Sequence, residues 1–276
     1  MAPRLTVVGS VNLDLVARTE RLPRPGETVT GATFSQIPGG KGANQAVAAA
    51  KLGAEVSLIA CVGADGFHAA ATTELERFGV DMTQFKVAEG AATGVALITV
   101  DAEGENEIVV APGANAELGP EDVDIGDTDG VLCQLEIPLE TVAHVARTAP
   151  GEFFLNAAPA LAPEGAVPAA DVTIVNHYEL EALSRREGLI AVTNGAEGAV
   201  LLEDGREVAR AVPPQVDAVD GTAAGDAFTA CLVVSLLEGR ARDESLRRAC
   251  VAGALAASRL GAQTSLPTAE EVDAFL

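Results

Sequence analysis

A run of small residues followed by a carboxylate is the strongest candidate for chemistry in this sequence. Residues 220–226 read Asp-Gly-Thr-Ala-Ala-Gly-Asp and lead into an apolar stretch with helical spacing. At the start of such a helix the N–H groups of Ala224, Gly225 and Asp226 would converge, where the helix dipole stabilises a phosphoryl group in transfer. Asp226 could accept the proton of an attacking hydroxyl. The alternative, equally compatible with this segment alone, is that Asp226 only stabilises the helix N-terminus.

A second glycine-rich segment, Gly39–Gln45, reads Gly-Gly-Lys-Gly-Ala-Asn-Gln and opens an alanine-rich stretch. Its glycines allow a ligand to approach the backbone closely. Lys41 and Asn44 add a strong donor and an amide, which suit a ligand with many hydroxyls. The segment lacks the spacing and the final Ser or Thr of a Walker A phosphate loop. A plain glycine turn beside a helix is an equally good interpretation of this segment by itself.

Polar groups also follow two apolar stretches that are typical of strands, Val172–Val175 and Leu189–Thr193. Ligands of open parallel sheets collect at the carboxyl ends of strands. After the first stretch, Asn176 and Glu179 could organise hydrated Mg²⁺ and nucleotide phosphates. After the second, Thr193–Gly198 offers a hydroxyl and glycines to phosphates. Each segment also has a simpler interpretation, the first as a helix start and the second as a turn.

Three further polar residues lie in or after strand-like segments. Asn12 and Asp14 alternate with apolar residues, so both face the same side of an extended segment. The Asp14 carboxylate can accept hydrogen bonds from two neighbouring hydroxyls. Glu136 follows an apolar strand in a similar way. A solvated strand face would show the same pattern, so these residues remain candidates only.

The elements that must position these residues alternate between β-branched runs and runs rich in Ala and Leu. Strands are expected at Leu5–Val8, Val56–Cys61, Val131–Leu135, Phe153–Asn156, Val172–Val175 and Leu189–Thr193. Helices are expected at Ala43–Leu52, Ala69–Phe78, Leu139–Ala146 and Ala224–Leu237. Such alternation predicts an α/β fold in which a mostly parallel sheet carries helices on both faces.

Two regions break this alternation and predict antiparallel ribbons. The pairs are Leu13–Thr19 with Thr28–Ile37, and Gly94–Val100 with Asn106–Val110. We expect them to form a small β-lid, spanning about 11–38 and 93–112, over one edge of the sheet. Because no long Pro- or Ser-rich linker divides the chain, residues 1–276 are expected to form one domain. The exposed edges of the lid could pair two copies into a homodimer.

Composition excludes several classes of protein. With 18 Lys and Arg against 40 Asp and Glu, the net charge of −22 repels nucleic acid and anionic membranes. The hydrophobic share of 48% excludes a disordered acidic chain. The four cysteines contain no C-x-x-C pair, so neither a zinc site nor a disulfide framework is indicated. Without a leader-like or membrane-spanning run, a cytoplasmic protein is expected.

The order and spacing of these segments, together with Pro25–Thr28 and Thr93–Leu97, closely resemble the ribokinase-like (PfkB) carbohydrate kinases. The resemblance runs from Val7 to Leu276. It implies a three-layer α/β/α domain with a small antiparallel β-lid. It also implies ATP-dependent phosphorylation of the 5-hydroxyl of D-ribose, with Mg²⁺ and K⁺ as cofactors and a sugar and ATP as small-molecule partners.

The resemblance further implies a role for each matching position. Sugar contacts fall at Asn12, Asp14, Gly39, Gly40, Lys41, Gly42, Asn44 and Glu136, with Asp226 as the base and with Ala224 and Gly225 beside it. Nucleotide positions are Asn176, Thr193, Asn194, Gly195, Ala196, Glu197, Gly198, Gly225 and Cys250. Glu179 corresponds to the acid associated with Mg²⁺. The loops around K⁺ correspond to Asp220, Thr222, Ala256, Arg259, Gly261 and Ser265, mostly through backbone carbonyls.

The chain departs from that pattern at several places. Cys250 stands where these kinases often have His, Gly221 where Thr is usual, and Cys231 where a small Gly or Ala is common. The segment Glu179–Ile190 lacks roughly one helix, which affects the nucleotide side. A nucleoside kinase or another sugar kinase, and a catalytically silent sugar- or nucleotide-binding regulator, remain alternatives. A dinucleotide oxidoreductase is weaker, because no G-x-G-x-x-G follows the first strand.

Overall fold

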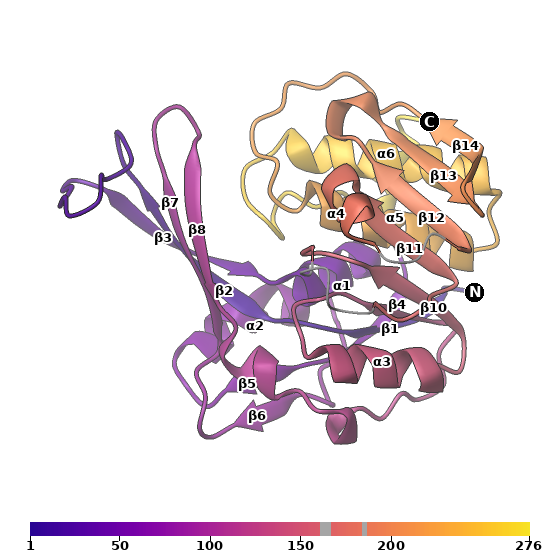
Figure 1. Cartoon of the computed structure of the whole chain (residues 1–276), viewed down its shortest axis with the longest axis horizontal. Helices are drawn as coiled ribbons and strands as arrows, with labels where there is room; N and C mark the ends of the chain where they lie inside the picture. Colours follow the sequence, from indigo (N-terminus) through magenta and orange to yellow (C-terminus); the bar gives the residue numbers. More distant parts are fainter. Residues whose placement is uncertain (161–166, 184–186) are drawn as a thin grey trace.

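An eight-stranded sheet forms the centre of the molecule (Figure 1). The computed structural model describes residues 1–160, 167–183 and 187–276. The strand order is β14-β13-β12-β11-β10-β9-β1-β4. The strands are β1 Arg4–Val8, β4 Glu55–Ile59, β9 Gly130–Cys133, β10 Glu152–Asn156, β11 Val172–Asn176, β12 Leu189–Thr193, β13 Ala199–Glu203 and β14 Arg206–Ala211.

The six strands from β4 to β12 are parallel, and each reads as a short run of mainly apolar residues. Such runs are typical of strands that helices cover on both faces. The predicted parallel sheet is therefore confirmed. The sheet also has an antiparallel edge that was not predicted, since β13 pairs with β12 and β14 pairs with β13 in antiparallel register.

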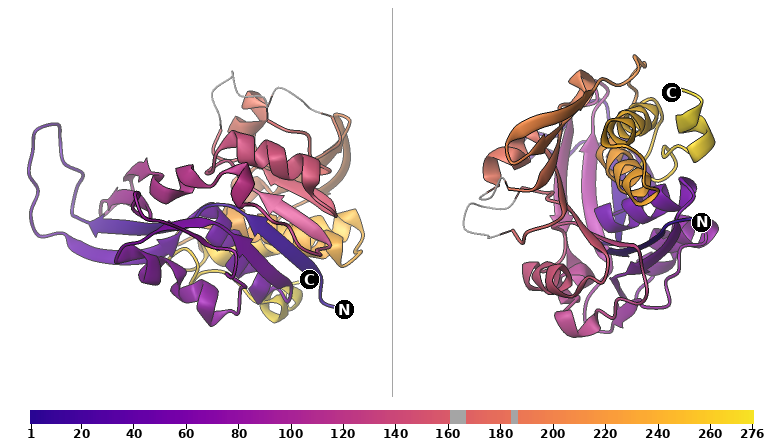
Figure 2. Two further views of the ribbon diagram at one scale, coloured as in Figure 1. Left: turned by 90° about the horizontal axis from the view of Figure 1, so that it is seen from below. Right: turned by 90° about the vertical axis from the view of Figure 1, so that its right-hand side faces the viewer.

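Helices cover both faces of this sheet (Figure 2). On one face lie α1 Lys41–Lys51, α2 Phe67–Arg77, α5 Ala224–Leu237, α6 Arg242–Ala257 and the short α7 Ala269–Asp273. On the other lie α3 Leu139–Thr148 and α4 His177–Ala182. Alternate residues of each strand point into the two resulting cores, so β1 sends Val7 to the first and Val8 to the second. The three-layer α/β/α fold is confirmed.

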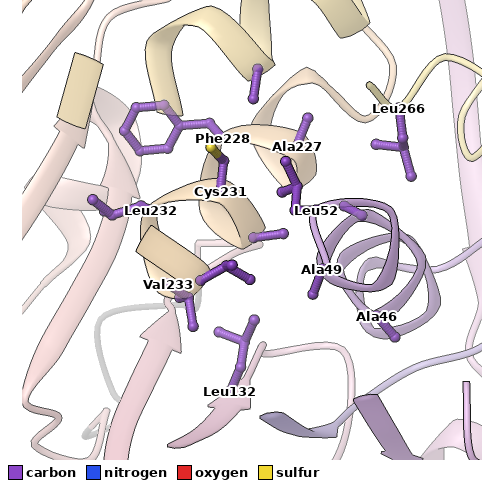
Figure 3. Packing of buried hydrophobic residues seen from close by; sticks show 14 of the residues in the cluster. Ala46, Ala49, Leu52, Leu132, Ala227, Phe228, Cys231, Leu232, Val233 and Leu266 are labelled. Carbon is purple, nitrogen blue, oxygen red and sulfur yellow. The ribbon is translucent and has the colours of Figure 1, made fainter. Parts of the chain in front are cut away.

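Small side chains bring α1 and α5 close together. Figure 3 shows Ala49 of α1 and Ala227 of α5 on the sides where the two helices face each other, with Leu132 of the sheet below them. All are buried. Because alanines allow helix axes to approach closely, the N-terminal ends of these two helices, which carry the two glycine-rich segments, become neighbours.

A second sheet projects from the main body (Figure 1). Its order is β3-β2-β7-β8, and its strands are β2 Asn12–Arg18, β3 Thr33–Gly39, β7 Gly94–Val100 and β8 Asn106–Ala111. The two expected antiparallel ribbons are present, and a parallel pairing of β2 with β7 joins them into one sheet. Strand β3 starts later than expected, because Gly26 and Gly31 hold the preceding loop in left-handed conformations.

A small strand pair and a short crossover complete the fold. Strands β5 Cys61–Gly63 and β6 Lys86–Ala88 form a small parallel pair. The described part of the crossover from β11 to β12 contains one helix, the six-residue α4, and residues 184–186 of the short segment Glu179–Ile190 lie outside the described ranges. None of the helices in those ranges has the length and apolar character that crossing a bilayer requires.

Candidate active site

The candidate residues gather at the carboxyl ends of the parallel strands, as expected for an open α/β sheet. The segment Ser10–Asp14 follows β1, Glu136 follows β9, and Asn176 ends β11. The start of α5 reaches the same edge through its packing against α1. The geometry therefore brings together residues that lie more than 200 positions apart in the chain, such as Asp14 and Asp226, whose charges interact.

Asp226 joins the two glycine-rich segments. Its Oδ2 accepts a hydrogen bond from Asn44 Nδ2 at 2.9 Å, and its Oδ1 accepts one from Gln45 Nε2 at 2.8 Å. The carboxylate is buried, with 6% of the residue exposed. A residue that only stabilised its own helix would not need two amides from another helix, so this arrangement favours the catalytic interpretation of Asp226.

The N-terminus of α1 is satisfied within the protein. The N–H of Lys41 donates to Glu136 Oε2 at 3.0 Å, and the N–H groups of Gly42 and Ala43 donate to the side chain and the carbonyl of Ser10. Ser10 Oγ also donates to Glu136 at 2.6 Å. A Cβ on Gly42 would lie 2.5 Å from Ser10 N, so this close approach requires glycine. The backbone of the segment Gly39–Gln45 is therefore used for packing within the protein.

The N-terminus of α5 differs. The Ala224 N–H, expected to line an anion site, instead donates to the Gly221 carbonyl at 3.2 Å. Within the described part of the chain, no acceptor binds the N–H groups of Gly225 and Asp226. They follow Ala223, whose left-handed φ of 59° is unusual for a residue with a side chain and costs about 1 kcal/mol. Two free donors thus remain at the positive end of a long helix, where an anion would bind.

One cation, Lys41, lies among three carboxylates. Burial opposes the charge of Lys41, but the negative charges of Asp226, Glu136 and Glu179 outweigh it and raise the pKa of Lys41. Burial raises the pKa of Asp14 to about 7, and the charges of Glu136 and Asp226 add to this effect. Burial also raises the pKa of Asp226, although Lys41, Asn44 and Gln45 oppose it. These electrostatic couplings place the predicted base, Mg²⁺ acid and sugar residues in one site.

The side chains expected to contact a sugar lie where backbone approaches them closely. Gly39 lies against Asp14, since a Cβ there would come within 2.5 Å of its carboxylate. Asn12 Oδ1 accepts a hydrogen bond from Asn115 Nδ2 at 2.7 Å. Asn115 also accepts from the Val11 N–H and is buried. The sequence pattern around Asn115 gives no sign of this role.

A pocket of about 930 Å³ opens beside the start of α5. Of the expected nucleotide residues it is lined by Thr193, Gly195, Ala196, Gly198, Gly225 and Cys250. Its remaining wall includes the irregular segment 212–218 and Phe228, Gly253, Ala254 and Ala257. The segment 212–218 has no periodic pattern in the sequence, so its place in this pocket was not predicted. The described lining does not include Asn176, Asn194 and Glu197.

Asn176 and Glu179 form a reciprocal cap at the start of α4. Asn176 Oδ1 accepts from the Glu179 N–H at 2.9 Å, and Glu179 Oε2 accepts from the Asn176 N–H at 2.8 Å. The simple helix-start interpretation is therefore correct for these bonds. Burial raises the pKa of Glu179, against the effects of the Asn176 N–H and the Lys41 charge. Glu179 therefore caps α4 and also belongs to the charge cluster.

Most residues expected around a monovalent cation lie in two loops that meet, one with Asp220 and Thr222 and the other with Arg259, Gly261 and Ser265, whereas Ala256 lies in the last turn of α6. Asp220 accepts hydrogen bonds from Thr222 N at 2.9 Å and from Gly261 N at 3.0 Å. The Arg259 side chain instead pairs with Glu271 at 2.7 Å, so only its backbone remains for an ion. In the same loop Gln263 is fully buried, and neither polar atom of its amide has a partner among the described residues. No cluster of three or more His, Cys, Asp or Glu that could bind a metal occurs within residues 1–160, 167–183 and 187–276.

Known proteins are similar to this chain in both sequence and fold. The model of the pfkB family carbohydrate kinases matches residues 2–269. The ribokinase of Haemophilus influenzae is 35% identical, with 100% of this chain and 99% of the relative covered. The deoxyribokinase of Salmonella typhimurium is 34% identical, with 99% and 98% covered. The structure of Arabidopsis thaliana ribokinase with ribose and ATP has a TM-score of 0.87 at 30% identity, covering 99% of this chain and 98% of that one.

These matches extend over the main sheet, the projecting sheet and both glycine-rich segments. They agree with a site that combines a buried carboxylate, a free helix N-terminus and a neighbouring pocket. The chain therefore belongs to the pfkB family of carbohydrate kinases and transfers a phosphoryl group to an alcohol acceptor.

Proposed function

We propose that this kinase phosphorylates the 5-hydroxyl of D-ribose with ATP and forms D-ribose 5-phosphate. The observation that carries the proposal is the position of Asp226, whose carboxylate both Asn44 and Gln45 hold beside the free N–H groups at the start of α5. Two relatives support the choice of substrates, since one is named a ribokinase and another was solved with ribose and ATP.

The sugar binds between the projecting sheet and the start of α1. Asp14 accepts two neighbouring hydroxyls, while Asn12, Glu136 and Lys41 complete the contacts. Asn44 donates to Asp226 through its nitrogen, and its buried Oδ1 has no partner in the described residues. That oxygen is therefore free to accept a hydroxyl of the sugar. Gly39 and Gly40 help indirectly, because they let Asp14 and the backbone of Asn12 pack closely against the start of α1, where a Cβ would come within 2.5 Å and 2.7 Å of them.

Asp226 takes the proton of the primary hydroxyl as the new oxygen–phosphorus bond forms and the bond between the γ-phosphorus and the bridging oxygen breaks, so that ADP leaves. The N–H groups of Gly225 and Asp226 stabilise the charge on the transferred phosphoryl group. The Ala224 N–H contributes less, because it already donates to Gly221. The projecting sheet excludes water from the site and so limits ATP hydrolysis.

The nucleotide occupies the pocket of about 930 Å³, whose walls include Thr193, Gly195, Ala196, Gly198, Gly225 and Cys250. Glu179 would hold Mg²⁺, whose preference for carboxylate and water oxygens fits this residue. K⁺ would bind beside α5, held by residues of two loops and of the end of α6. These residues are Asp220, Thr222, Ala256, Arg259, Gly261 and Ser265. The unpartnered amide of Gln263 in this loop supports a polar occupant. When bound, both ions neutralise phosphate charge.

A panel of acceptors tests the proposal. D-Ribose is expected to give the highest kcat/KM for ADP formation, above 2-deoxy-D-ribose, hexoses and nucleosides, and K⁺ is expected to raise its rate. The deoxyribokinase relative makes 2-deoxy-D-ribose the sharpest competitor. A higher kcat/KM for deoxyribose or a nucleoside would overturn the choice of sugar. Absence of ADP with every acceptor would favour the silent regulator.

We also propose that two copies pair through the projecting sheet. Its edge strand β8 is exposed along its whole length, and Ile108, Val109 and Val110 are 53%, 64% and 52% exposed. An apolar edge of this kind is a template for pairing. Sedimentation is expected to give twice the chain mass of 28.0 kDa. Val109→Lys is expected to give the monomer, and a wild-type monomer would contradict the pairing.

A further inference from the structure

A chain of three buried side-chain amides lies behind Asp226. Gln45 and Gln134 are fully buried and Asn156 is 7% exposed. Gln45 Nε2 donates to Asp226 Oδ1 at 2.8 Å and to Asn156 Oδ1 at 2.9 Å. Gln134 Nε2 donates to Gln45 Oε1 at 2.6 Å. The proposed phosphoryl transfer gives none of these three amides a direct contact with substrate.

These bonds allow only one orientation of the Gln45 amide. Asn156 uses its own nitrogen to donate to the Ile174 carbonyl at 3.1 Å, so its oxygen faces Gln45. Gln134 presents a donor to the oxygen of Gln45. If the Gln45 amide rotated by half a turn, its oxygen would face two other acceptors, one of them the Asp226 carboxylate. The nitrogen of Gln45 is therefore fixed toward Asp226.

The residues that anchor these amides belong to the central sheet. Gln134 follows β9, Asn156 ends β10, and the Ile174 carbonyl belongs to β11, so three adjacent parallel strands hold the amides. Gly9, which follows β1, leaves room for the Gln134 side chain, because any Cβ at this position would overlap Gln134 Oε1. The orientation of Asp226 is thereby tied to the central sheet as well as to its own helix.

We propose that Gln45 is a positioning residue for phosphoryl transfer, which fixes one oxygen of Asp226 through the amide chain and leaves the other lone pairs open to the acceptor hydroxyl. This inference rests on the proposed role of Asp226 as the base. Lys41, Glu136 and Asp14 also act on Asp226 through their charges, and Asn44 donates to its second oxygen. Gln45 differs from Asn44 in one respect. Asn44 has a free oxygen that can accept a hydroxyl of the sugar, whereas Gln45 has no free group to offer to the sugar.

Gln45→Met removes the donor while keeping a side chain of similar length. We expect kcat to fall about 10-fold to 100-fold, because a hydrogen bond to a charged group is lost and the base is less well oriented. Without this donor the carboxylate binds its proton more tightly. The acidic limb of the kcat profile should therefore move to higher pH by about one unit. KM for the sugar should stay close to that of the wild type.

Gln134→Met provides a second measurement if Gln45→Met does not fold. It leaves the bond from Gln45 to Asp226 but frees the Gln45 amide to rotate, so a smaller change in the same direction is expected. Thr141→Val is the matched control, because the buried Thr141 hydroxyl donates to the Leu118 carbonyl at 2.6 Å on the opposite face of the sheet. It should lower the melting temperature without moving the pH profile.

The possible results separate this inference from the proposed function. A folded Gln45→Met protein with the kcat and pH profile of the wild type would overturn the positioning role, even if Asp226→Asn is inactive. An unmoved pH profile in Gln134→Met would do the same where Gln45→Met is unfolded. If Asp226→Asn retains turnover, the base assignment itself fails. A parallel shift in Thr141→Val would show that the change reports lost stability, which also overturns the inference.

Discussion

Asp226→Asn is expected to lower kcat by about 10²-fold to 10⁴-fold, the usual range for removing a general base. The amide cannot accept the proton of the primary hydroxyl, whereas Asn44 and the residues around Asp14 still bind the sugar. KM for the sugar should therefore remain close to that of the wild type. Steady-state kinetics with ADP detection, at saturating ATP, measures both constants.

The substitution also changes local hydrogen bonding. The carboxylate accepts from two NH₂ groups, those of Asn44 and Gln45. An Asn at this position presents its own NH₂ to one of them, so one buried donor loses its acceptor at a cost of about 1–3 kcal/mol. A thermal melt beside the kinetics separates this stability loss from the loss of the base.

Asp171→Asn is a suitable control for this acid-to-amide change. Asp171 accepts the Phe153 N–H at 2.8 Å near the amino end of β10, at the opposite end of that strand from the candidate site. We expect kinetics like those of the wild type. Near-wild-type turnover in a folded Asp226→Asn protein would contradict the base assignment, because Asn44 and Gln45 donate to no second carboxylate in the described part of the chain.

The architecture could be predicted from local patterns because each pattern reflects a local physical demand. Strands covered on both faces must be apolar, so Val172–Val175 and Leu189–Thr193 identified neighbouring parallel strands. Turn residues and alternation identified the ribbon from Gly94 to Val110. The parallel pairing of β2 with β7 was not predictable, because strands more than 80 residues apart carry no mark of their register.

The candidate site divides in the same way. The two glycine-rich segments looked alike in sequence, yet Ser10 and Glu136 satisfy the amides of one helix start while those of Gly225 and Asp226 stay free. That difference depends on Ser10 and Glu136, which lie about 30 and 95 residues away from the segment Gly39–Gln45 in the sequence. Asn115 escaped prediction for the same reason, since a lone buried amide gains its role only from what packs around it.

Sugar binding should weaken as the pH falls through about 7, because burial raises the pKa of Asp14 to that value, with the charges of Glu136 and Asp226 as further causes. Above pH 7 the ionised carboxylate accepts two hydroxyls. Below it the protonated group loses acceptor capacity, so the Kd should approach a tenfold rise for about each pH unit. Calorimetric titration with the acceptor preferred in the panel, without nucleotide, measures this dependence.

Asp14→Asn should raise the Kd at every pH and remove most of the dependence on pH. Although Asp14→Asn weakens sugar binding, it should increase the stability of the folded protein at high pH. A carboxyl whose pKa is raised by folding favours the folded state at low pH, and this contribution is lost as the pH rises through about 7. The Asn variant should therefore match the wild-type melting temperature near pH 4 and exceed it at pH 8. Weaker binding together with higher stability is the result expected of a residue kept for its ligand, whereas a residue kept for packing would lose stability at both pH values and so contradict the assignment.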